Sequence, residues 1–188
     1  MSNPSPETAN QPTADDWLRD AAAVMQRLQA SGQGVGVATR EAAAGLTGLE
    51  LLQAALRGEL PRTHIGETMD FLLIEVSHGR AVFQGVPQTK HLNPMGTVHG
   101  GWYATLLDSA VGCAVHTTMP AGRAYTTAEL SVNLVRGAVP GREPLRAIGQ
   151  VIHVGRQLAT AEGRIVDAAG KVYAHATTTC LVFEAPAR

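Results

Sequence analysis

The spacing of hydrophobic residues changes character at about residue 68. Before that point, apolar residues recur at helical spacing in two short segments, which the glycine-rich stretch 31–37 separates. Residues 15–65 are therefore predicted to form a helical extension that packs on the outside of a main domain or drapes over a neighbouring subunit. Residues 1–14 are rich in Pro, Asn, Ser and Thr, which is typical of a disordered tail.

Both predicted helices of the extension carry candidate end signals. Thr47 is followed three residues later by Glu50, which is a capping-box pattern, and Gly58 is placed to end the same helix. For the first helix, Asp15 or Asp16 is the candidate N-cap.

After residue 68, strand-like runs surround one long apolar helix. The predicted strands are residues 69–76, 81–86, 124–136, 145–154, 158–167 and 172–183, and the predicted helix is 98–118. This order predicts an α+β fold in which a helix packs on an antiparallel sheet. A helix with so few polar residues must be covered nearly all round, so the sheet must curl around it or a second subunit must cover it.

Composition excludes several classes of protein. The chain has 188 residues, of which 16% are charged, with a formal net charge of -1 and no sign of nucleic-acid binding. Cys113 and Cys180 are too few for a disulfide framework or a Cys-based zinc site. The stretch 98–119 contains Asp108, two histidines and three glycines, which disfavours a membrane helix. With no apolar leader pattern at the start, we predict a cytoplasmic protein.

The residues that precede the long helix suit the binding of an oxyanion. Pro94 pushes Asn93 into an extended conformation, so Asn93 is predicted to lie in a loop. Thr97 is the candidate cap of the helix. Gly100 and Gly101 have no side chains, so a ligand atom can approach backbone amides at the positive end of the helix dipole.

Asp108 is the only formally charged residue between His91 and Gly122. A buried carboxylate without a partner costs several kcal/mol, so we interpret Asp108 as a base or nucleophile; the alternative is a structural Asp bonded to a backbone amide. Asp108 lies eight residues after Gly100, which is about 12 Å along one helix. The two groups can therefore act on one carbonyl only if Asp108 meets the glycine amides of another subunit, across a two-fold axis.

These residues resemble a known family. The chain contains Asn93, Gly96, the run His99-Gly100-Gly101, Asp108 and the strand at 125–136. This combination is similar to that of the PaaI-type (phenylacetate-degradation-related) acyl-CoA thioesterases of the hot-dog fold. The resemblance covers about residues 66–184, and we assign residues 66–188 to this domain. It implies a curved antiparallel sheet wrapped around a central helix. It also implies a homodimer with one continuous sheet, with dimers pairing into a homotetramer.

The resemblance further implies roles for individual residues. The Gly100 amide would polarise the thioester carbonyl, and Asp108 of the other subunit would activate water or attack directly. Asn93 would orient the lytic water or the thioester, and His99 would hold the loop by hydrogen bonding. Thr126 matches a family Ser/Thr position that holds water near the acid. Strand alternation predicts that Thr126 faces the core.

Coenzyme A carries phosphates, so basic residues are expected near the mouth of the site. Arg136 and Arg156 are candidates, and Gly155 would let the pantetheine arm approach the backbone, as Gly101 would for the thioester. The reaction needs no metal and no cofactor beyond the coenzyme A thioester that is the substrate.

Two other functions stay open. A hot-dog hydratase or dehydratase would normally carry a His and an acid as a dyad, whereas an Asp with a water-positioning Asn fits hydrolysis better. A non-catalytic acyl-CoA sensor would be expected to lose the carboxylate or to carry a DNA-binding helix pair. The sequence does not specify the acyl group: phenylacetyl, hydroxylated benzoyl and medium aliphatic chains are all open.

Overall fold

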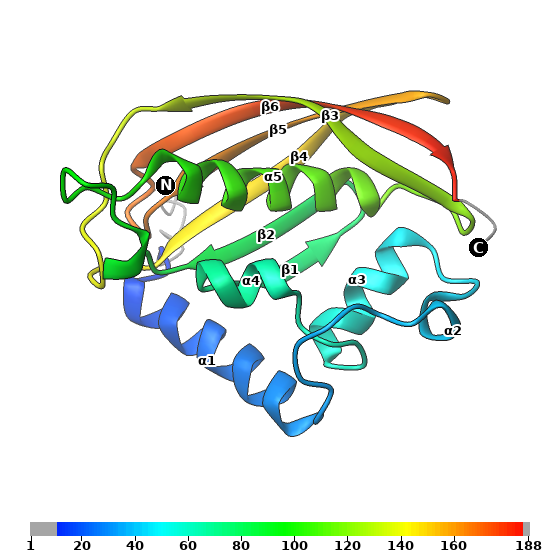
Figure 1. Cartoon of the computed structure of the whole chain (residues 1–188), viewed down its shortest axis with the longest axis horizontal. Helices are drawn as coiled ribbons and strands as arrows, with labels where there is room; N and C mark the ends of the chain where they lie inside the picture. The colour runs from blue at the N-terminus through cyan, green and yellow to red at the C-terminus, as the bar shows by residue number, and fades with distance from the viewer. Residues whose placement is uncertain (1–10, 186–188) are drawn as a thin grey trace, which may run out of the picture.

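A computed structural model describes residues 11–185 and contains one six-stranded antiparallel sheet in the order β1-β2-β4-β5-β6-β3 (Figure 1). The sheet curves around the long helix α5 (Gly100–His116), which packs against strands from both halves of the sheet. The predicted hot-dog architecture is confirmed. The strands are β1 (Phe71–Ser77), β2 (Arg80–Gly85), β3 (Arg123–Leu134), β4 (Leu145–Val154), β5 (Leu158–Val166) and β6 (Val172–Glu184).

The sheet lies unusually close to the middle of α5. A Cβ atom at Gly149 of β4 would lie 2.2 Å from the carbonyl oxygen of Ala110, so only glycine fits at this crossing. Around it, Leu106, Leu107 and Val111 of α5 are completely buried. This contact holds the helix that carries the candidate site in a fixed position on the sheet.

Strand β3 contains a β-bulge that reverses its alternation. Its pairing with β6 shifts register between Thr127 and Glu129. On the C-terminal side of the bulge, Leu130 and Val132 are half-buried, as the alternation predicts. On the N-terminal side the order is inverted: Thr127 is half-buried and Thr126 is exposed, because the extra residue moves one set of side chains to the opposite face.

The N-terminal extension contains four helices, α1 (Ala14–Ala30), α2 (Arg40–Ala43), α3 (Gly48–Arg57) and α4 (His64–Met69). The capping box of Thr47 with Glu50 and the left-handed Gly58 at the end of α3 are as predicted. The predicted cap of α1 is wrong, because Thr13 caps it and Asp16 is the third residue of that capping box. The short helices α2 and α4 were not predicted. Of the predicted tail, residues 1–10 lie outside the described range.

The extension is tied to the sheet and to α5. The side-chain amide of Gln84 on β2 donates a hydrogen bond to the Trp17 carbonyl at 2.9 Å. The Arg146 guanidinium of β4 lies 4.4 Å from the centre of the Trp17 ring and pairs with Asp20 at 2.8 Å. At the other end of the domain, the Gly48 amide of α3 bonds the carbonyl of Met119, just beyond α5. No helix among the described residues is long and apolar enough to cross a membrane.

Candidate functional site

The start of α5 leaves one backbone amide available. His99 is the N-cap: its Nδ1 accepts a hydrogen bond from the Gly101 N–H at 2.8 Å, and its carbonyl accepts one from the Trp102 N–H at 3.0 Å. The prediction that Thr97 caps this helix is therefore wrong. Within residues 11–185 the Gly100 N–H has no protein acceptor, so it is the amide at the positive helix end that can bind an oxyanion.

Asn93 organises the loop before the helix. Its Oδ1 accepts hydrogen bonds from the amides of Met95 and Thr97, at 3.0 and 3.2 Å, and its Nδ2 donates to the Thr97 hydroxyl at 2.8 Å. The predicted cap Thr97 is thus occupied in closing this turn. One hydrogen of the Asn93 amide group is left for another acceptor.

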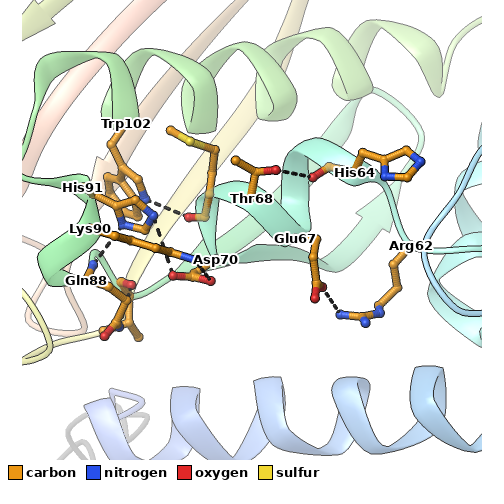
Figure 2. A network of polar contacts seen from close by, with 11 residues as sticks. Arg62, His64, Glu67, Thr68, Asp70, Gln88, Lys90, His91 and Trp102 are labelled. Carbon is orange, nitrogen blue, oxygen red and sulfur yellow. Dashed lines mark hydrogen bonds and ion pairs between the residues drawn. The ribbon is translucent and has the colours of Figure 1, made fainter.

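The end of α4 fixes the other side of the same loop (Figure 2). Asp70 pairs with Lys90 at 3.0 Å and lies 3.6 Å from Nε2 of the buried His91. The indole N–H of Trp102 donates to the Met69 carbonyl at 2.9 Å. The extension therefore helps to position the loop that carries Asn93 and the first turn of α5.

Asp108 is half-buried on the side of α5 that faces β3, and its protein partner is a hydroxyl that was not predicted. The Thr127 hydroxyl donates to Oδ1 of Asp108 at 2.9 Å. The prediction that Thr126 faces the core is wrong, because the β3 bulge places Thr127 there instead. The adjacent threonines were the only signal in the sequence, and alternation alone selected the wrong one.

Three ionisable groups on or beside the second half of α5 have shifted pKa values. Burial, followed by the nearby negative charge of Asp108, raises the pKa of the Cys113 thiol to about 12. Burial also raises the pKa of the Tyr125 hydroxyl well above its usual value and lowers that of the His116 imidazole. Cys113 is therefore a poor nucleophile, which leaves the Asp108 carboxylate as the group suited to base or nucleophilic chemistry.

Within one chain, the Gly100 amide and the Asp108 carboxylate are not brought together. Both lie on the uninterrupted helix α5, about 12 Å apart along its axis at 1.5 Å per residue. One carbonyl group cannot touch both groups of the same protomer.

The candidate coenzyme A residues lie at opposite ends of the domain. Arg136 follows the end of β3 beside the start of α5, where Leu134 packs over Gly100, and its guanidinium lies 5.8 Å from the Tyr173 ring. Arg156 adjoins the beginning of β3, where its carbonyl accepts a hydrogen bond from Arg123. Arg136 is therefore near Gly100 of its own chain, whereas Gly155 and Arg156 are near the other end of α5. Within residues 11–185, no cluster of three or more His, Cys, Asp or Glu side chains could hold a metal ion.

Comparison with known sequences finds similarity to thioesterases and esterases. Residues 95–174 match the model of the Thioesterase superfamily. A protein named as an esterase from Caenorhabditis elegans is 34% identical over 90 residues, which are 48% of this chain and 52% of that protein. One from Halobacterium salinarum is 37% identical over 89 residues, 47% of this chain and 58% of that protein. The chain thus spans little more than half the length of these relatives.

Solved structures of thioesterase-like proteins are similar to this chain over a larger part of its length. A phenylacetic acid degradation-related protein of Ralstonia eutropha is 28% identical with a TM-score of 0.62, covering 69% of this chain and 97% of that one. A PaaI variant from Thermus thermophilus is 26% identical with a TM-score of 0.57, and the match covers 62% of this chain and 96% of that one. A Streptococcus mutans protein bound to acetyl CoA is 25% identical with a TM-score of 0.56, and the match covers 61% of this chain and 89% of that one. The resemblance to PaaI-type hot-dog thioesterases is confirmed.

Proposed function

We propose that this protein hydrolyses acyl-CoA thioesters to a free acid and coenzyme A, at sites shared between the two protomers of a homodimer. The observation that carries the proposal is that α5 holds both a Gly100 N–H without an acceptor among residues 11–185 and a half-buried Asp108 carboxylate, about 12 Å further along the helix. The similarity to thioesterases supports this reading of the two groups.

In the proposed mechanism, the Gly100 N–H donates to the thioester oxygen and stabilises the negative charge that develops there. Asp108 of the partner subunit either activates a water molecule or attacks the carbonyl carbon itself. The Thr127 hydroxyl orients that carboxylate, and the remaining hydrogen of the Asn93 amide orients the water or the thioester. His99 contributes by holding the helix start, because its Nδ1 is occupied by the Gly101 amide.

A two-fold axis that makes two copies of α5 antiparallel would assemble each site from complementary ends. One protomer would contribute Gly100, Gly101 and Arg136 to a site. The other protomer would contribute Asp108, Gly155 and Arg156. The two arginines would then face the phosphates of one coenzyme A molecule. The acetyl CoA bound by the Streptococcus mutans neighbour supports this class of ligand.

Three further features belong to the proposal. The resemblance implies that dimers pair into a homotetramer. We also propose a cytoplasmic location and, because thioester hydrolysis needs an oxyanion hole and a carboxylate, a reaction without metal or added cofactor.

A panel of acyl-CoAs with a free-thiol readout tests the function. The panel covers phenylacetyl, hydroxylated benzoyl and aliphatic thioesters, and the variants are Asp108→Asn and, as a matched control, Glu129→Gln on the exposed side of β3. Hydrolysis should fall by about 10²–10⁴-fold in Asp108→Asn and stay unchanged in Glu129→Gln. Equal hydrolysis in wild type and Asp108→Asn would contradict the mechanism. Tight binding without hydrolysis of any ester would favour the acyl-CoA sensor instead.

A further inference from the structure

A cavity of about 480 Å³ lies between the N-terminal extension and the hot-dog domain. This volume is within the range of small-molecule sites. Its lining is mainly apolar and comes from α1, α3, β1, β2 and α5, including Met25, Leu28, Leu52, Leu56, Phe71 and Cys113.

The cavity meets the candidate catalytic helix at Cys113. This residue lies five positions after Asp108 on α5, about 7.5 Å along the axis at 1.5 Å per residue. Both residues are only half-buried, whereas the sheet-facing residues of α5 are completely buried. At 3.6 residues per turn the two side chains point about 140° apart, Asp108 toward Thr127 of β3 and Cys113 toward the cavity. An apolar group attached to a thioester at Asp108 would therefore reach the cavity across the half-exposed face of α5, without crossing the sheet.

The charged groups in the cavity lining are already paired. Arg62 bonds Glu67 at 2.6 Å, and Figure 2 shows their side chains pointing toward each other. Asp70, also in the lining, pairs with Lys90. The lining thus holds two carboxylates and one guanidinium that is already engaged, a poor setting for an anionic head group. The ligand portion that fits here is apolar and uncharged, and its polar part must lie elsewhere.

We propose that this cavity holds the aliphatic acyl chain of the thioester, and that α3 of the extension sets the chain length that is accepted. The proposal rests on the hydrolytic function proposed above. The match with the Ralstonia eutropha neighbour covers 69% of this chain and 97% of that one. Residues 66–188 make up about the same share of this chain. We infer that the shared part is the hot-dog domain and that the wall contributed by the extension is additional to it.

The test is a chain-length profile of kcat/KM from acetyl-CoA to hexadecanoyl-CoA. Ala55 lines the cavity from α3 and is half-buried, so Ala55→Phe should fill part of the space. The matched control is Ala22→Phe on the exposed side of α1, and Leu52→Ala enlarges the cavity should Ala55→Phe not fold. In wild type, each methylene that enters should raise kcat/KM about fourfold until the cavity is full.

Ala55→Phe should shorten the preferred chain and lower kcat/KM for the longest good substrate at least about tenfold, since two or more methylenes lose their place. Acetyl-CoA turnover should stay within about twofold of wild type, because no part of it needs the cavity. Ala22→Phe should leave the profile unchanged, and Leu52→Ala should lengthen the preferred chain. An unchanged profile in the cavity variants, or an equal loss with every substrate, would overturn the proposal.

A binding measurement separates this proposal from the catalytic one. If wild type hydrolyses no thioester, the proposed function fails. Calorimetry with the non-hydrolysable thioether S-decyl-CoA then measures binding to the cavity independently of catalysis. Weaker binding of S-decyl-CoA by Ala55→Phe, with S-methyl-CoA binding unchanged, supports an acyl site. Equal binding of S-decyl-CoA by wild type and Ala55→Phe overturns it, as does free decanoic acid that binds wild type but not Ala55→Phe and does not compete with S-decyl-CoA.

Discussion

Replacing Gly100 with proline removes one hydrogen-bond donor from the proposed site with little other change. Proline is well tolerated at the first position of a helix, which is where Gly100 lies. His99 before it has φ -62° and ψ 136°, an extended conformation that a residue preceding proline readily adopts. The new side chain would press on Leu134 Cδ1, which lies 2.8 Å from the position of a Cβ atom. Leu134 is 53% exposed, so its side chain can move aside.

The expected loss follows from the loss of that single amide. Removing one oxyanion donor typically costs about 2.7–4 kcal/mol of transition-state stabilisation, or roughly 10²–10³ in kcat. Gly100→Ala is the control, because it has the same contact with Leu134 and keeps the N–H. Steady-state kinetics on a hydrolysed acyl-CoA, with urea unfolding of both variants, measures the effect. If Gly100→Pro is folded and its kcat is within about threefold of Gly100→Ala, the Gly100 amide is not the oxyanion donor.

Three further changes test other parts of the structure. Thr127→Val should lower kcat about tenfold by releasing the Asp108 carboxylate of the proposed site, whereas Thr126→Val should leave kcat unchanged; equal kinetics of the two variants would contradict the assigned orientation of Thr127. Gly149→Ala should destabilise the fold by about 1–3 kcal/mol or more in urea unfolding, because its methyl group meets the backbone of α5; wild-type stability would refute that close contact. Burial lowers the pKa of His116, so below pH of about 6.5 the unfolded chain takes up a proton that the folded chain does not. Below that pH the free energy of unfolding of wild type should fall, relative to that of His116→Gln, by up to about 1.4 kcal/mol for each pH unit. Parallel curves of unfolding free energy against pH for the two proteins would contradict this.

The fold could be predicted because its elements are marked locally. The strand at 145–154 has the predicted limits, and the other strands end within two residues of theirs. The capping box at Thr47 is a signal confined to four residues, and it was identified correctly. The helices α2 and α4 are too short to carry a periodic pattern.

The site was less predictable where it depends on long-range pairing. The choice between Thr126 and Thr127 depends on a bulge that exists only when β3 pairs with β6. The sequence does not mark His99 as a cap, because Ser, Thr, Asp and Asn are the usual helix N-caps. The cavity brings α3 together with Cys113 of α5, residues far apart in the sequence.

The central claim is that each site combines Gly100 of one protomer with Asp108 of the other. The most direct measurement is the activity of purified, doubly tagged heterodimers of a Gly100→Pro chain and an Asp108→Asn chain. If the site is shared, one of the two sites has both groups intact, and the heterodimer should show about half the wild-type kcat per dimer while each parent homodimer is inactive. If activity stays at the level of the parent homodimers in verified heterodimers, both groups act within one chain and the account is contradicted.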